Sequence, residues 1–194
     1  MGYIAKLKGL CYNCDISYIG DDPMKDKTCC FFGHRKIEET LELRTKLYDT
    51  IERLITDENI DTFLFGSKSE FDALCHETVT ELKEKYPHIK RIYVRAEYPY
   101  IDDHYKAVLL KDYEDTYFPA HMTEAGKASY IERNCYMIDN SRVCVVYYNP
   151  DYAPPRRKAT RKSLTDRQPK SGTKLAYDYA IRKCKTIIHL HKEK

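Results

Sequence analysis

The sequence of 194 residues lacks the features that would assign it to a membrane, secreted or strongly charged class. No apolar run is long enough to cross a bilayer, and the first residues, Met1–Lys6, lack the apolar core of a signal peptide. The 33 lysine and arginine residues barely exceed the 30 aspartate and glutamate residues, so a net charge of +3 makes no case for a nucleic-acid-binding protein. We therefore expect a cytoplasmic protein with no membrane partner.

Cysteine is too sparse for a disulfide scaffold. The eight cysteines are about 4% of the chain and accompany no export signal, so we expect reduced thiols. Cys11 and Cys14 followed by Cys29 and Cys30 suggest zinc ligation, but a second CxxC is missing. Cys29 and Cys30 fall in an expected strand, whose successive side chains point to opposite faces. The two thiols therefore cannot bind the same ion. We predict no metal site. The other thiols fall on elements expected to be buried: Cys75, Cys135, Cys144 and Cys184.

Short apolar runs alternate with amphipathic helical patterns along most of the chain. The runs predict strands at residues 29–32, 62–65, 89–94, 143–148 and 186–190. Apolar residues at three- and four-residue spacing predict helices over 37–55, 71–82 and 172–183, and a short helix is expected near 104–111. Strands that are apolar throughout belong to a parallel sheet covered on both sides. The predicted fold class is α/β, a Rossmann-like parallel sheet with helices on both faces.

The length and the 42% hydrophobic content predict one domain rather than two. We place it at residues 25–194, with residues 1–24 as an N-terminal extension. Two internal segments are less regular. Residues 97–118 hold several tyrosines among acidic residues, and this segment forms either a surface for a partner or the wall of a pocket. Residues 149–170 carry seven basic residues and two acids. That net +5 leaves −2 for the rest of the chain, so the positive charge is concentrated in one loop.

The turn Gly33-His34-Arg35 follows the first expected strand. In parallel α/β folds, ligands bind beyond the carboxyl ends of the strands, where helix N-termini favour anions. A flexible backbone, a histidine and an arginine at such a turn suit a phosphate group, since guanidinium binds phosphate through two hydrogen bonds. The alternative is a tight turn that needs glycine, with Arg35 paired to a nearby carboxylate.

A second turn repeats this arrangement after the second expected strand. Gly66 and Ser67 offer backbone and hydroxyl donors, and Asp72 can accept hydrogen bonds from a ribose. The alternative is an acid in the first helical turn that complements the helix dipole. The chain contains neither GxGxxG nor GxxxxGK[ST], so it lacks the dinucleotide fingerprint and the P-loop. We expect no bound cofactor.

The last helix begins after the basic loop with Ser171, Gly172, Thr173 and Lys174. Hydroxyls, a glycine backbone and a lysine at a helix N-terminus form an anion cradle, although helix capping alone also selects serine and threonine. The adjacent basic loop favours the anion site.

Taken in chain order, the three turns resemble the SLOG superfamily. This Rossmann-like group includes the Smf/DprA proteins, the LOG phosphoribohydrolases and the YpsA-like branch, and the chain looks nearest to the last of these. The resemblance covers about residues 25–190. It rests on Cys29-Cys30-Phe31-Phe32-Gly33-His34-Arg35, on Phe65-Gly66-Ser67 with Phe71-Asp72, and on Ser171-Gly172-Thr173.

The resemblance implies a site for a nucleotide or nucleotide-derived ligand, with phosphate held at Gly172 and Thr173. In LOG enzymes an arginine and a glutamate serve hydrolysis of an N-glycosidic bond, and Arg133 matches the arginine. The glutamate has no match here, since the nearest acid after Thr173 is Asp178, about one helical turn further on. Glu132 and Asp72 remain candidates for its role.

Three functions follow. The first is binding of a phosphorylated nucleoside compound, to sense or sequester it, without turnover. The second is an N-glycosidic hydrolase in which Arg133, Glu132 or Asp72 serves catalysis. The third is DprA-like binding of nucleic acid through the basic loop 156–170, since basic clusters bind phosphates and tyrosines stack on bases. Whether the protein is an enzyme stays open, and a homo-oligomer is plausible from the resemblance.

Overall fold

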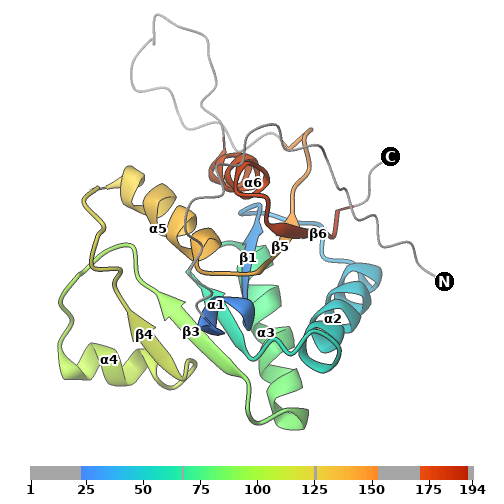
Figure 1. The fold of residues 1–194 in the computed structure, drawn as a ribbon, viewed down its shortest axis with the longest axis horizontal. Coiled ribbons are helices and arrows are strands. Elements are labelled where there is room, and N and C mark those ends of the chain that lie inside the picture. Colours follow the sequence, from blue (N-terminus) through green and yellow to red (C-terminus); the bar gives the residue numbers. More distant parts are fainter. Residues whose placement is uncertain (1–22, 67, 125, 153–170, 192–194) are drawn as a thin grey trace, which may run out of the picture.

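A computed structural model describes residues 23–66, 68–124, 126–152 and 171–191 (Figure 1). Six parallel strands form one sheet in the order β4-β3-β2-β1-β5-β6. The strands are β1 (Thr28–Gly33), β2 (Thr62–Phe65), β3 (Lys90–Val94), β4 (Asp115–Tyr117), β5 (Val143–Tyr147) and β6 (Thr186–His189). The helices are α1 (Pro23–Asp26), α2 (Leu41–Thr56), α3 (Glu70–Lys85), α4 (Asp103–Leu109), α5 (Lys127–Asp139) and α6 (Gly172–Arg182).

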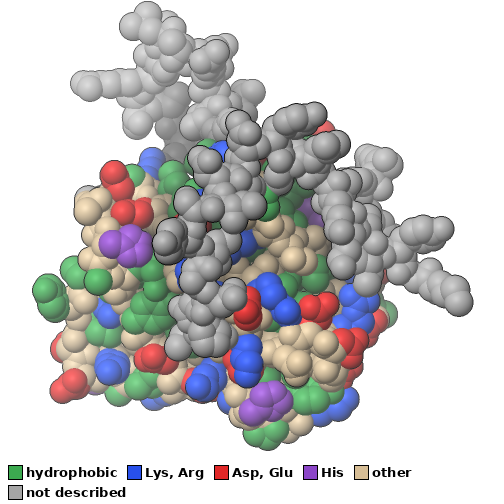
Figure 2. Space-filling model, in the orientation of Figure 1, with side chains coloured by type: hydrophobic (Ala, Val, Ile, Leu, Met, Phe, Trp, Pro, Cys, Tyr) green, Lys and Arg blue, Asp and Glu red, His purple; other side chains and the backbone are tan. Residues whose placement is uncertain are grey.

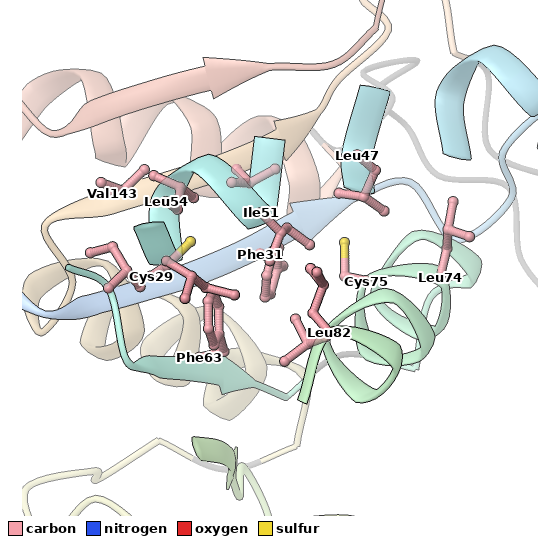
Figure 3. Packing of buried hydrophobic residues seen from close by; sticks show 14 of the residues in the cluster. Cys29, Phe31, Leu47, Ile51, Leu54, Phe63, Leu74, Cys75, Leu82 and Val143 are labelled. Carbon is pink, nitrogen blue, oxygen red and sulfur yellow. The ribbon is translucent and has the colours of Figure 1, made fainter. Parts of the chain in front are cut away.

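Helices cover both faces of the sheet, as the sequence predicts (Figure 1). On one face, α2 and α3 pack against Cys29, Phe31 and Phe63, and Figure 3 shows these side chains meeting Leu47, Ile51 and Leu82 from the helices. On the other face, α5 and α6 pack against Cys30, Phe32 and Leu64 through a second core that includes Met137, Ile138, Ala176 and Ala180. Since β1 and β5 lie in the middle of the sheet, their side chains contribute to both cores.

Polar residues mark the first turn of the helices that follow β1, β2 and β5. Thr40 caps α2, Ser69 caps α3 and Ser171 caps α6, each accepting a hydrogen bond from the backbone N–H three residues on. Such side chains satisfy donors that the helix itself leaves unpaired. The caps therefore fix where each helix begins at the carboxyl edge of the sheet.

The structure confirms the fold class and adds three elements that the sequence pattern did not reveal, of which the first is the short helix α1. The edge strand β4 has only three residues, and Asp115 at its start is exposed. The helix α5 turns Ser129, Arg133, Met137 and Ile138 inward, so two of its four buried side chains are polar. A pattern of apolar residues alone does not detect such a face.

Cysteines occupy more varied positions than expected. Cys29 and Cys30 point into opposite cores, which confirms the prediction from strand geometry. Cys75 and Cys144 are buried, whereas Cys135 is half-buried and Cys184 is exposed. Burial was therefore wrongly predicted for Cys184, which follows α6 with a positive φ of 52° at the turn into β6. The pair Cys11 and Cys14 lies outside the described residues. Among the helices that the structure describes, none is long and apolar enough to span a membrane.

Candidate functional site at the carboxyl edge of the sheet

The order of the strands defines a switch point between β1 and β5. From β1 the chain adds β2, β3 and β4 on one side, and β5 and β6 lie on the other side. Ligands of open α/β sheets bind in the crevice outside the carboxyl ends of the two strands at such a point. The turn after β1, Gly33-His34-Arg35, lies at this point and contacts three neighbouring elements.

The first contact joins the β1 turn to the N-terminus of α6. The Thr173 hydroxyl donates a hydrogen bond of 2.8 Å to the Gly33 carbonyl oxygen. The Ser171 Oγ accepts a hydrogen bond of 3.1 Å from the Lys174 N–H and so caps the helix. Gly172 is exposed, and a Cβ added there would meet no atom within 4 Å. The N-terminus of α6, with its partial positive charge, therefore lies beside the β1 turn.

The second contact joins the β1 turn to the start of α3. The Glu70 N–H donates to the Arg35 carbonyl oxygen at 3.0 Å, and the Glu70 carboxylate accepts from the Ile37 N–H at 3.1 Å. The carboxylate also forms an ion pair with Lys36. The Lys36 ammonium, and next the Ile37 N–H, lower the pKa of Glu70. The Arg35 side chain is exposed, and no hydrogen bond or ion pair ties it to another described residue.

The third contact joins His34 to the end of β5. The buried imidazole stacks on Tyr152, with ring centroids 4.0 Å apart. The Asn149 N–H lies 2.8 Å from Nε2 and can only donate, so in the neutral ring Nε2 accepts and Nδ1 carries the proton. Burial lowers the pKa of His34. The Asn149 carbonyl oxygen, 3.1 Å from Nε2, raises the pKa but has the smaller effect. The Nδ1 atom is buried without a hydrogen-bond partner among the described residues.

The glycines of the first two turns allow close packing. A Cβ at Gly33 would lie 2.3 Å from side-chain atoms of Phe71, in the first turn of α3. A Cβ at Gly66 would lie 2.5 Å from the Arg133 guanidinium. Neither residue has a positive φ, so steric exclusion and not a left-handed backbone requires glycine here. This differs from the usual reason for glycine in a tight turn.

Arg133 forms hydrogen bonds with the protein backbone at the carboxyl ends of β2 and β3. It is buried on α5, and its Nη1 donates hydrogen bonds to the carbonyl oxygens of Gly66 and, at 3.4 Å, Val94. Buried Asp72, in the first turn of α3, contributes a nearby negative charge. Burial lowers the pKa of Arg133, and the charge of Asp72 opposes this change. Arg133 therefore holds α5 against the carboxyl ends of β2 and β3.

The remaining predicted residues take part in local contacts. Lys174 forms an ion pair of 2.7 Å with Asp178, one helical turn further along α6. Glu132 accepts hydrogen bonds from the backbone N–H groups of Thr123 and Glu124, and so holds the loop before α5. Ser67 and the basic loop 156–170 lie outside the described residues. A group of three or more residues able to hold a metal ion is absent from the described part of the chain.

Sequence reasoning missed Asn149, whose backbone orients His34. Asn149 directly follows the expected strand 143–148, so the rule that led to the other turns also points to this residue. The pattern could not reveal that Asn149 acts through its backbone, which is a feature of the folded turn.

The fold and the switch-point geometry define a Rossmann-like α/β protein with a candidate ligand site at the carboxyl edge of its sheet. The family model of YpsA, described as the YspA SLOG family, matches residues 25–179. The chain therefore belongs to this SLOG family. A comparison with curated proteins found no significant match.

Two solved structures of DNA processing proteins share the fold. The chain is similar to DNA processing protein A (DprA) from Streptococcus pneumoniae, with a TM-score of 0.52 and 13% identity over 87% of this chain. It spans 51% of that protein, about half its length. DNA processing protein A from Helicobacter pylori, studied for its single-stranded DNA binding mode, has a TM-score of 0.51 and 16% identity, covering 90% of this chain and 70% of that protein.

Proposed function

We propose that the protein binds a nucleotide or nucleotide-derived phosphorylated ligand at the switch point between β1 and β5, where it senses or sequesters that ligand. One observation carries the proposal: the Thr173 hydroxyl joins the N-terminus of α6 to the Gly33 carbonyl oxygen, so a helix N-terminus and the β1 turn meet at this point. Helix N-termini at such points bind phosphate groups through backbone N–H donors and the helix dipole.

The charges around the switch point favour an anion. Arg35 is exposed at the β1 turn, whereas Lys174 in the first turn of α6 is ion-paired with Asp178. The carboxylate of Glu70 does not oppose an anion strongly, because Lys36 neutralises it in an ion pair. In the proposed complex the phosphate lies against the N–H groups of Gly172 and Thr173, and the guanidinium of Arg35 binds its outer oxygens.

Calorimetric titration and thermal shift against nucleotides, nucleotide sugars and cyclic nucleotides test the proposal, with product analysis of every hit. We expect Arg35→Ala to raise the Kd for the best ligand about tenfold to a hundredfold, because a hydrogen bond to a charged group contributes about 1.5–3 kcal/mol. The matched control is Arg53→Ala, which removes an exposed arginine from the last turn of α2.

The hydroxyl of Thr173 gives a second comparison. Thr173→Ala is expected to weaken binding, whereas Thr173→Ser keeps the hydroxyl and is expected to bind like the wild type. Unchanged affinity in both Arg35→Ala and Thr173→Ala would show that the ligand binds elsewhere. Release of free base or ribose phosphate from a bound compound would show that the protein hydrolyses it. The proposal of binding without turnover would then be wrong.

The hydrolase alternative gains little support from the geometry of its candidate residues. Arg133 donates to backbone carbonyls, Asp72 is buried, and Glu132 is bonded to the loop before α5. A proton donor has to come within hydrogen-bonding reach of the glycosidic bond.

Binding of single-stranded DNA is the second candidate function, favoured by the similarity in fold to the Helicobacter pylori protein. The basic loop 156–170 would supply the phosphate contacts. Fluorescence anisotropy with a labelled single-stranded oligonucleotide at low salt tests it, and the affinity is expected to fall steeply as salt rises. Absence of binding at low salt would remove this candidate.

A further inference from the structure

A buried donor at the switch point has no partner among the residues that the structure describes. His34 is 2% exposed and reaches from the end of β1 to the end of β5, where its Nε2 lies 2.8 Å from the Asn149 N–H. That contact leaves the proton on Nδ1, which is buried and forms no hydrogen bond with a described residue. Buried polar groups are nearly always hydrogen-bonded. An unpaired donor in the crevice where α/β proteins bind ligands therefore indicates a group that meets a ligand.

Tyr152 lies against the imidazole of His34 and also buries an unpaired polar atom. The two rings stack, with centroids 4.0 Å apart and planes inclined by 15°. The hydroxyl of Tyr152 is buried and forms no hydrogen bond within the described part of the chain. Burial of a hydroxyl without a partner is unfavourable. Movement of this ring into water would remove that cost and would uncover His34.

Other aromatic rings near His34 are held by contacts of their own. Tyr148 stacks on Tyr177 of α6, with ring centroids 5.1 Å apart, and Tyr147 packs against the core between the sheet and the helices α2 and α3. Within the described residues, the ring that lies against Tyr152 is that of His34 alone. Tyr152 is therefore the ring at this point that can move at the lowest cost.

We propose that the Nδ1–H of His34 selects the ligand by donating a hydrogen bond to one of its oxygen atoms, and that the ring of Tyr152 moves aside to admit this oxygen. This inference rests on the proposed function, because it assigns a specificity-determining residue to the same site. A phosphate oxygen and a base carbonyl oxygen both accept such a bond. A ligand amino group does not, since it would need the proton of His34 on Nε2, facing the Asn149 N–H at 2.8 Å.

The charge state of His34 and the surrounding surface both fit selection by a hydrogen bond. Burial lowers the pKa of His34, so the imidazole is neutral at neutral pH and carries one N–H. Figure 2 shows acidic and basic side chains intermixed over the described surface of the face that it draws. On that face, selectivity therefore depends on single groups and not on a surface of one charge. A site with a buried donor rejects a compound that leaves the donor unpaired.

Two substitutions of His34 separate a contact with the ligand from support of the turn. The side-chain nitrogen of asparagine can take the place of Nδ1, and that of glutamine the place of Nε2. The full chain is titrated by calorimetry with inorganic pyrophosphate and with adenosine, guanosine and uridine monophosphates. We expect His34→Gln to raise the Kd of a bound compound about tenfold, and His34→Asn to raise it less than about threefold. The matched control is His76→Gln, which should leave the Kd unchanged, since Nε2 of His76 also lies near a backbone oxygen, 3.0 Å from that of Asp112.

The outcome separates this inference from the proposed function. A loss in His34→Gln that includes pyrophosphate assigns the acceptor to a phosphate oxygen, and a loss confined to the nucleotides assigns it to the nucleoside. Equal affinity of His34→Gln and the wild type, or equal losses in both His34 variants, would overturn the inference while the proposed function stands. If none of the four compounds binds the wild type, the inference is wrong, and the wider ligand screen decides the proposed function.

Two further measurements keep the test decisive if a His34 variant folds poorly, which far-ultraviolet circular dichroism detects. Tyr152→Ala should lower the Kd at least about threefold, because no ring has to move before the ligand binds. Tyr152→Phe should raise the Kd, because the covering ring no longer buries a hydroxyl. Long-range proton–nitrogen correlation NMR of the wild type should show the proton of neutral His34 on Nδ1. A proton on Nε2 instead, or weaker binding by Tyr152→Ala, would overturn the inference.

Discussion

Removing the guanidinium of Arg133 is expected to lower the free energy of unfolding strongly without changing the helices of the folded state. Arg133→Met keeps much of the volume of the side chain but leaves the carbonyl oxygens of Gly66 and Val94 without their donor. It also leaves the buried charge of Asp72 without the nearby positive charge. Leaving a buried hydrogen-bond acceptor without its donor costs about 1–3 kcal/mol. We expect a loss of this size in the free energy of unfolding.

Urea unfolding at pH 7 measures this loss, with Arg53→Met as the control for removal of an exposed arginine. The control should change stability by less than about 0.5 kcal/mol. Addition of Asp72→Asn to Arg133→Met should recover part of the loss, because the negative charge that Arg133 offsets is then absent. A loss below about 1 kcal/mol in Arg133→Met, or no recovery in the double variant, would refute a supporting role for this arginine.

Two further predictions concern the β1 turn. Gly33→Ala is expected to lower the free energy of unfolding by about 1–3 kcal/mol, because the new Cβ overlaps with Phe71, and urea unfolding checks this. For His34, burial lowers the folded pKa, so the unfolded chain binds the proton more readily. The contribution of neutral His34 to the free energy of unfolding is fully present above the unfolded pKa of about 6.5. It is lost as the pH falls from there towards the lower pKa of the folded state. His34→Gln should therefore show a smaller fall in urea midpoint than the wild type between pH 7.5 and 5.5, and equal slopes would contradict a buried neutral His34.

Local patterns in the sequence determined much of the fold. The apolar run of Cys29–Phe32 and its counterpart at residues 143–148 predict β1 and β5 closely, because central strands of a parallel sheet bury both faces. The apolar spacing of α2 and α3 likewise reflects one buried stripe on each helix. The same reasoning led to the turns at Gly33 and Gly66 and to the start of α6, since ligand sites of this class follow the carboxyl ends of strands.

The tertiary structure decided what those turns contact. From the sequence, Arg133 was a candidate for catalysis, but its position on α5 and its distance from Gly66 depend on how helix and sheet pack. The helix itself escaped prediction because Ser129 and Arg133 form half of its buried face, and polar side chains become buried only where the fold supplies partners. The order of the strands, which places His34 beside Asn149 at the switch point, is likewise set by long-range pairing and not by any local pattern. Local sequence thus determines the elements and their buried faces, whereas contacts between distant residues determine the site.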